Sequence, residues 1–236
     1  MAITSARISL QRRNCVRSPQ TCQFGIRSSL YTIGVAIDPS RPTAYGWPVA
    51  AMTGTFTLGP GAGRVLISTT RLGIAARAGH DLTLEVTRWS ARVEVPPEDA
   101  GAATAAATVR AELDLGSIEV REGRGGAKPL SGRDRREISK TMTGLLGTGV
   151  ATFVSSGVVR AGASGGAIEG TLSLSGTSAP VRLQVTEPGP DRYRGSATVR
   201  QTALGIKPYV GFFGALKVAD EVTVEFEVDL AQAGRA

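Results

Sequence analysis

Few residues of this chain could carry out covalent chemistry. His80, in the segment A-G-H-D-L at 78–82, is its only histidine. The segment G-A-S-G-G at 162–166 matches the G-x-S-x-G pattern of a serine nucleophile. That pattern needs a helix after the serine and a histidine downstream, whereas here a strand-like run follows and His80 lies upstream. We therefore expect a flexible loop at 162–166, no catalytic residue, and a protein that is not an enzyme.

The chain also has few residues that could bind a metal ion or a cofactor. Both cysteines, Cys15 and Cys22, lie near the start of the chain, so the rest cannot build a zinc site from cysteine and histidine. We expect no metal and no cofactor. Two roles for His80 stay open: a contact to a ligand head group at the mouth of a barrel, or a turn residue whose ring bonds the local backbone.

The formal net charge of +7 is unevenly distributed along the chain. Residues 1–51 hold six arginines against one aspartate, so the remaining residues are nearly neutral with interspersed signs. Nucleic-acid binding needs a concentrated basic face, and we expect no nucleic-acid partner. A smaller basic group opens a predicted helix and consists of Lys128, Arg133, Arg135 and Arg136. This group either attracts an anionic ligand group such as a pyrophosphate, with Arg133 and Arg136 as candidate head-group contacts, or forms a solvated face.

Residues 1–51 show neither strand nor helix periodicity, and we expect a disordered extension or a wrongly assigned start, with Met52 as the candidate true start. The folded domain is then 52–236. No apolar run approaches the roughly 20 residues of a membrane helix. No signal-peptide pattern is recognisable, which favours a cytoplasmic location, while a periplasmic or secreted one stays open. Whether the chain forms a homodimer also stays open.

Alternation of apolar and polar residues dominates the rest of the chain. In 222–230 every second residue is apolar and the residues between them are polar, as in a strand with one buried face. The run 109–115 alternates in the same way. The alternation slips by one residue near Thr87–Arg88, where we predict a β-bulge. Strands are predicted at about 55–59, 64–70, 72–77, 82–95, 105–120, 150–160, 166–176, 179–187, 192–203 and 220–231.

Short connections between these runs are typical of an antiparallel meander, which forms a sandwich or a barrel. One helix is predicted at 131–146, where Ile138, Met142, Leu145 and Leu146 form an apolar stripe. Ser131 can cap its start, and Gly147 can end it. We expect this helix to lie across or over the sheet.

The segment I-K-P-Y-V-G-F-F-G at 206–214 places bulky apolar residues in a connection, where polar residues are usual. It is a lid over an apolar cavity, a patch for transient membrane contact, or a plug that seals one barrel end. A barrel of about eight strands is either filled by side chains or holds a ligand. A hollow is favoured by small residues at predicted inward positions, namely Ala91, Ala111, Gly195 and Ala197.

Several stretches together resemble the YceI-like, polyisoprenoid-binding family over about 55–230. They are GHDLTLEVTRWSARVEV at 79–95, LDLGSI at 113–118, SGRDRREISKTMTGLLG at 131–147, IEGTLSLSGTSAPVRL at 168–183 and SATVRQTALGIKPYVGFFGALKVADEVTVEFEV at 196–228. The resemblance implies an all-β fold, an extended antiparallel lipocalin-like β-barrel of about eight strands with one inserted amphipathic helix. It also implies binding of an isoprenoid or related long-chain lipid in an apolar tunnel, without catalysis.

We therefore expect a lipid carrier or sensor. The candidate ligand-binding residues are Leu84, Val86, Leu113, Leu115, Phe153, Leu172, Leu174, Tyr209, Phe212, Phe213, Val224 and Phe226. One alternative is a small hydrolase or isomerase, which would need His80 to converge with a carboxylate such as Asp81 or Glu169. Another is a filled barrel that acts as a stress-response interaction module.

Overall fold

The structure is a computed structural model that describes residues 53–96, 107–160 and 165–235. The predicted extension at 1–51, the candidate start Met52 and the serine of the 162–166 motif lie outside these residues. Strands and short 3-10 turns make up most of the described chain, together with one α-helix. The predicted all-β class with a single inserted helix is confirmed.

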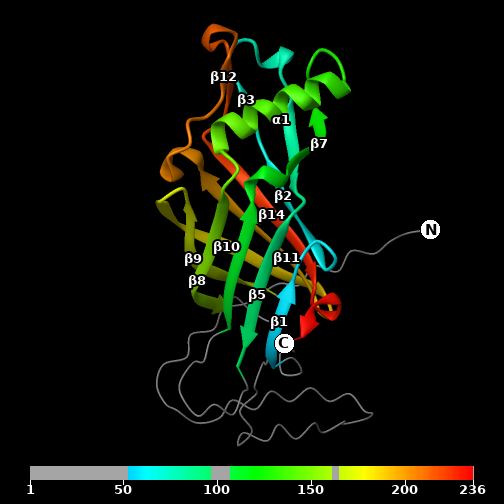
Figure 1. Ribbon diagram of the computed structural model, residues 1–236, viewed down its shortest axis with the longest axis vertical. Coiled ribbons are helices and arrows are strands. Elements are labelled where there is room, and N and C mark those ends of the chain that lie inside the picture. Colours follow the sequence, from blue (N-terminus) through cyan, green and yellow to red (C-terminus); the bar gives the residue numbers. More distant parts are fainter. Residues whose placement is uncertain (1–52, 97–106, 161–164, 236) are drawn as a thin grey trace, which may run out of the picture. The chain divides into compact units, whose positions relative to one another are not determined.

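Twelve of the described strands form one sheet, in the order β15-β1-β5-β6-β8-β9-β10-β11-β14-β2-β4-β7, with antiparallel pairing throughout (Figure 1). A separate three-stranded sheet has the order β12-β13-β3. The strand bounds are β1 Gly54–Leu58, β2 Gly63–Ser68, β3 Arg71–Leu72, β4 Asp81–Val86, β5 Trp89–Val95, β6 Thr108–Asp114, β7 Ile118–Arg124, β8 Val150–Arg160, β9 Gly165–Leu174, β10 Thr177–Gly189, β11 Arg192–Arg200, β12 Val210–Gly211, β13 Leu216–Val218, β14 Glu221–Asp229 and β15 Gly234–Arg235.

The fifteen described strands exceed the predicted eight, partly because short strands such as β12, β13 and β15 were not predicted and partly because the chain bends inside two predicted strands. The segment 82–95 is β4 and β5, and the expected bulge at Thr87–Arg88 is a break between them. The segment 105–120 is likewise divided into β6 and β7 by the 3-10 turn η3 (Leu115–Ser117). A further predicted strand at 72–77 is wrong beyond Leu72, because Gly73 adopts a left-handed φ of 101° and a 3-10 turn, η2 (Ala76–Ala78), follows.

These two breaks curl the sheet on itself. β4 lies near one end of the strand order and β5 near the other, although only two residues separate them. Three consecutive Cα–Cα steps span at most about 11 Å, so the two ends of the twelve-stranded order must meet. The short connection through η3 between β6 and β7 crosses the same seam. The result is a barrel whose seam is closed by connections, since the described order ends at β15 and β7 without pairing them.

Ser117 holds this seam together from the inside. Its side chain is 4% exposed, and it is the one buried polar residue in the described part of the chain. Its hydroxyl donates to the Asp114 carbonyl at 2.7 Å and accepts the Arg88 backbone N–H at 2.9 Å. Its carbonyl accepts the Thr87 hydroxyl at 2.8 Å. Both breaks are therefore joined through one residue.

The helix α1 (Gly132–Leu146) begins and ends as predicted. Ser131 caps it in a capping box with Asp134, and Gly147 follows its last turn with a φ of 72°. Arg135 donates to the carbonyls of Val120 and Arg121 at 2.7 and 2.9 Å, which anchors the helix on β7. No residue of α1 is fully buried, and the helix lies across one end of the barrel, near β12 and β3 (Figure 1).

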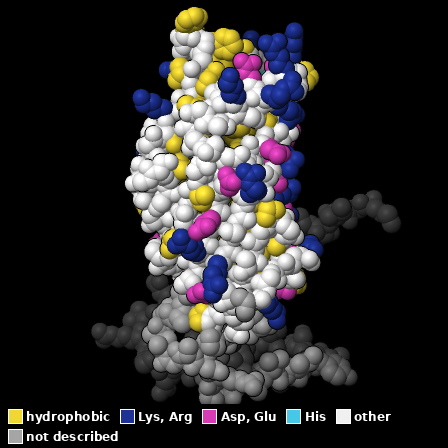
Figure 2. All heavy atoms as spheres, viewed as in Figure 1, with side chains coloured by type: hydrophobic (Ala, Val, Ile, Leu, Met, Phe, Trp, Pro, Cys, Tyr) yellow, Lys and Arg dark blue, Asp and Glu magenta, His cyan; other side chains and the backbone are white. Residues whose placement is uncertain are grey.

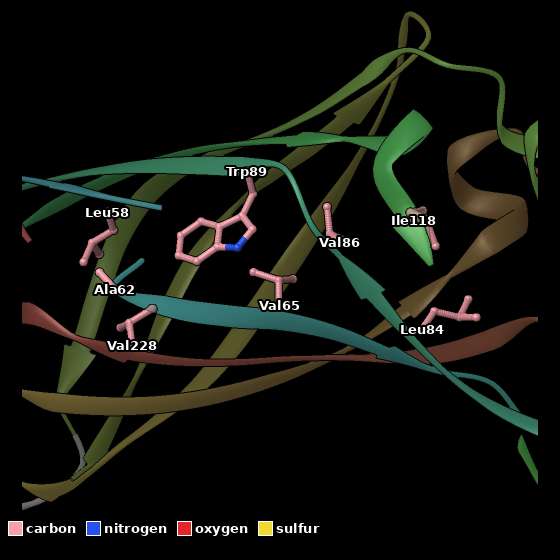
Figure 3. Packing of buried hydrophobic residues seen from close by; sticks show 8 residues of the cluster. All are labelled: Leu58, Ala62, Val65, Leu84, Val86, Trp89, Ile118 and Val228. Atoms are coloured by element: carbon pink, nitrogen blue, oxygen red, sulfur yellow. The ribbon is translucent and has the colours of Figure 1, made fainter. Parts of the chain in front are cut away.

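Buried apolar side chains line the inside of the barrel in two clusters. One draws on strands from both ends of the sheet and comprises Leu58, Ala62, Val65, Leu84, Val86, Trp89, Ile118 and Val228 (Figure 3). The other comprises Phe153, Ala179, Val181, Ala197, Val199, Leu204 and Val222. Many other inward side chains remain only half-buried, because the space between the walls is open.

Candidate functional site

The barrel encloses a cavity of about 980 Å³. This volume is at the upper end of the roughly 300–1,000 Å³ that is usual for ligand pockets. Its walls are the inward faces of the alternating strands: Val109, Ala111 and Leu113 of β6 line it, and so do Val222, Val224 and Phe226 of β14. The described interior is therefore hollow, whereas the alternative of a filled barrel requires side chains to occupy this space.

Most of the predicted ligand-binding residues lie on the cavity wall. They are Leu84, Val86, Leu113, Leu115, Phe153, Leu172, Leu174, Tyr209, Phe212, Val224 and Phe226. Phe213 is the exception, because its side chain is fully exposed and is not part of the wall. Ligand binding by these side chains stays a prediction, but alternation along the strands was sufficient to place the strand residues among them inward, whereas Tyr209 and Phe212 come from a connection.

Four small residues were expected to leave space in the barrel, and two of them line the cavity while the other two do not. Ala91 and Ala111 face each other across β5 and β6 and line the cavity. Gly195 instead lies opposite Phe226, and a side chain there would collide with the Phe226 ring. The missing side chain of Gly195 therefore makes room for an aromatic ring, a device typical of strongly curved sheets. Ala197 belongs to the packed core and not to the cavity wall.

The helix contributes a wall that the list of candidate binding residues omitted. Ile138, Met142, Leu145 and Leu146 all line the cavity. Leu145 is 42% exposed, although it belongs to the apolar stripe. The signal was present in the sequence as the stripe itself, but only the fold shows that the stripe faces a hollow and not a packed sheet.

Polar groups are confined almost entirely to one end of the cavity, which we call the mouth. Apart from the tyrosines and Trp89, the polar wall residues are Thr69, Arg71, His80, Lys128, Asp134, Glu137, Thr141, Gln201 and Lys217. Backbone bonds tie their segments together: Thr69 donates to Leu82, and Ala219 donates to Thr70. The opposite reach of the cavity is lined by apolar residues such as Val95, Val158 and Val185, with Tyr193 beside them. The cavity is therefore amphipathic, apolar along its length and polar at the mouth.

Arg71 and His80 organise the mouth. The Arg71 guanidinium donates to the carbonyls of Gly79 and Arg124 at 2.9 and 2.8 Å. His80 Nε2 lies 2.7 Å from the Lys128 carbonyl, and because a carbonyl only accepts, this nitrogen carries the proton. Hydrogen bonds from the Ser131 hydroxyl and backbone N–H lower the pKa of the Asp134 carboxyl, which keeps it ionised. The histidine ring thus bonds a carbonyl 48 residues along the chain, not the local backbone that one of its two expected roles required, and it lines the mouth.

The cations at the mouth differ from those expected. Arg133 and Arg136 are exposed on α1 and are not part of the cavity wall. Arg71, Lys128 and Lys217 are part of it. Arg71 and Lys217 lie in the three-stranded sheet, far along the chain from the helix, so only the fold brings them to the mouth.

The two carboxylates named for the enzymatic alternative do not converge with His80, and the carboxylates that share the cavity wall with it are Asp134 and Glu137. Asp81 accepts the Arg71 backbone N–H at 2.8 Å, and Glu169 accepts Arg182 at 2.9 Å. Neither carboxylate lines the cavity beside His80. Within the described ranges no cluster of histidine, cysteine, aspartate and glutamate could hold a metal ion, and no helix there is long and apolar enough to cross a membrane.

The comparisons with known proteins point to one family. A family model described as the YceI-like domain matches residues 56–230, a range that contains every residue of the cavity wall. No curated protein sequence matches the chain.

Similar solved structures show low sequence identity. BcnA of Burkholderia cenocepacia is 17% identical with a TM-score of 0.49, covering 70% of this chain and 94% of that chain. A polyisoprenoid binding domain from Saccharophagus degradans, implicated in plant cell wall breakdown, is 12% identical with a TM-score of 0.43, covering 75% and 99%. The YCEI protein of Campylobacter jejuni is 12% identical with a TM-score of 0.43, covering 65% and 85%.

Proposed function

The chain belongs to the family of YceI-like domains, and from that premise we propose that it binds an amphiphilic lipid without catalysing a reaction. A polyisoprenoid chain is the leading candidate. The apolar tail occupies the cavity, and the polar head group stays at the mouth beside Arg71, Lys128 and Lys217. The observation that carries this proposal is the division of one 980 Å³ cavity into a long apolar part and a polar mouth.

Burial of the tail supplies the driving force. Each methylene that leaves water contributes about 0.8 kcal/mol. The open space already separates the walls, so the ligand does not have to displace packed side chains. A charged head group buried at the far end would lose its hydration without compensation, whereas at the mouth it keeps both water and cationic neighbours. An amphiphile therefore enters in one orientation.

Native mass spectrometry of the full chain tests the proposal. The purified protein is incubated with a polyprenyl phosphate, a straight-chain fatty acid of similar length, or a mixed lipid extract. A one-to-one complex is expected, with the polyprenyl phosphate favoured over the fatty acid. A protein that takes up no lipid from any of these preparations would defeat the proposal.

A matched pair of variants links uptake to the cavity. Ala111→Trp places a large ring in the hollow, whereas Ser90→Trp places the same ring on the exposed face of the adjacent strand. Uptake should be lost in the first and retained in the second, while circular dichroism shows that both remain folded. Equal uptake by the two variants would place the lipid elsewhere and contradict the proposal.

A further inference from the structure

Exposed apolar side chains gather beside the mouth, and they include the four most exposed large apolar residues of the described chain. Leu72, Ile74, Val210, Phe212 and Phe213 belong to β3, β12 and the turns that follow them. Ile74 is 96% exposed and Phe213 is fully exposed. Register joins the segments, because Lys217 of β13 lies opposite Val210 on one side and Leu72 on the other. We call these five residues the apolar tip.

The backbone holds the two phenylalanines outward at a conformational cost. Phe212 and Phe213 both have positive φ values, 48° and 54°, in the left-handed region that bulky residues rarely adopt. Such a conformation is strained for a bulky residue because its Cβ lies too close to the following carbonyl oxygen. Burial usually offsets such strain, yet the Phe213 ring is fully exposed and Phe212, which lines the cavity, is still 63% exposed. Strain of this kind is typical of functional positions, where a partner covers what the free protein exposes.

Positive charge surrounds the tip. The mouth segments, residues 70–80, 124–137 and 206–218, contain nine basic and two acidic residues. The rest of the described chain contains twelve basic and fifteen acidic residues, so the sign of the net charge reverses away from the mouth. Among the described residues, Arg77, Lys207 and Lys217 make no ion pair. Figure 2 shows hydrophobic and basic side chains together at the end that carries β12, β3 and α1 in Figure 1.

The tip is continuous with the cavity. Tyr209 and Phe212 are exposed at the surface and also line the cavity, and Lys217 between the strands lines it as well. A molecule seated on the tip would therefore be at the entrance. Apolar groups encircled by cations complement one surface in particular: a bilayer with anionic head groups over an apolar interior.

We infer that the apolar tip docks on an anionic lipid bilayer, with Ile74, Phe212 and Phe213 inserted below the head groups and the basic side chains at the level of the phosphates. This inference rests on the proposed function, since the bilayer is then the place where the bound lipid is collected or delivered. The mouth opens toward the membrane, and the lipid crosses no water between bilayer and cavity.

Vesicle flotation of the full chain tests the inference. Vesicles of phosphatidylcholine with phosphatidylglycerol are compared with vesicles of phosphatidylcholine alone, at low and high sodium chloride. Binding is expected to the anionic vesicles, to weaken with salt, and to fall by about tenfold or more in the double variant Ile74→Ser with Phe213→Ser. The double variant Val150→Ser with Val154→Ser is the control, because these residues are exposed apolar positions on β8 outside the mouth.

Lipid uptake in solution separates the two proposals. Ile74 and Phe213 do not line the cavity, so their variant should still form the complex with polyprenyl phosphate seen by native mass spectrometry. Vesicle binding that is unchanged in this variant, or equally reduced in the β8 control, overturns the docking inference and leaves the cavity proposal standing. A dimer in sedimentation analysis that the tip variant alone converts to monomer also overturns it, because the tip would then bind a second copy of the chain.

Discussion

Removal of the buried hydroxyl of Ser117, at the seam of the barrel, should lower the free energy of unfolding. Ser117→Ala deletes the group that donates to the Asp114 carbonyl at 2.7 Å and accepts the Arg88 N–H at 2.9 Å. The site is 4% exposed, so water replaces these bonds poorly. A buried polar group left without its partner costs about 1–3 kcal/mol. We expect a loss of about 2 kcal/mol in the free energy of unfolding.

Urea unfolding followed by circular dichroism measures this loss, and thermal unfolding gives a second readout. In a chain of this size each kcal/mol lowers Tm by about 2–4 °C. Ser90→Ala, on the exposed face of β5, is the matched control and should change stability by less than about 0.5 kcal/mol. A Ser117→Ala protein as stable as this control would refute the reasoning, because the seam would then be held by its connections alone.

Two further predictions concern the helix and the acid limit of stability. Ser131→Ala removes the cap of α1, and it should lower the free energy of unfolding by about 1 kcal/mol and speed hydrogen exchange at 132–136. The control Ser139→Ala, in the helix interior, should not speed this exchange. Similar exchange in the two variants would contradict the capping role of Ser131. Hydrogen bonds from Arg194 and then Arg64 lower the pKa of Glu227. Because this pKa is lower in the folded than in the unfolded protein, ionised Glu227 stabilises the fold at pH values above the unfolded pKa of about 4.3. This stabilisation is lost as the pH falls through the folded pKa. Glu227→Gln should therefore flatten the loss of stability in urea titrations below about pH 4, with Glu225→Gln as the control; an unchanged acid limb would count against it.

Alternation and capping made much of this protein predictable. The inward faces of 109–115 and 222–230 follow from a period of two, and both faces line the cavity. The helix ends at Ser131 and Gly147 follow from local chemistry that depends on neighbouring residues alone. The prediction failed where the same local pattern permits two outcomes. A one-residue slip at Thr87–Arg88 fits either a bulge or a strand break, and only the pairing partners of β4 and β5 decide between them.

The sequence by itself determined most of the strands and their inward faces, the helix and its caps, because each depends on residues close together in the chain. The tertiary structure alone decided how the sheet closes and what gathers at its mouth. Ser117 joins two breaks 29 residues apart, and Arg71 meets the Arg124 carbonyl across 53 residues. The periodicity of the sequence carries no information on such long-range contacts, because they depend on which strands pair. The hollow itself belongs to the same class, because its volume is set by the distance between opposite walls and not by any single strand.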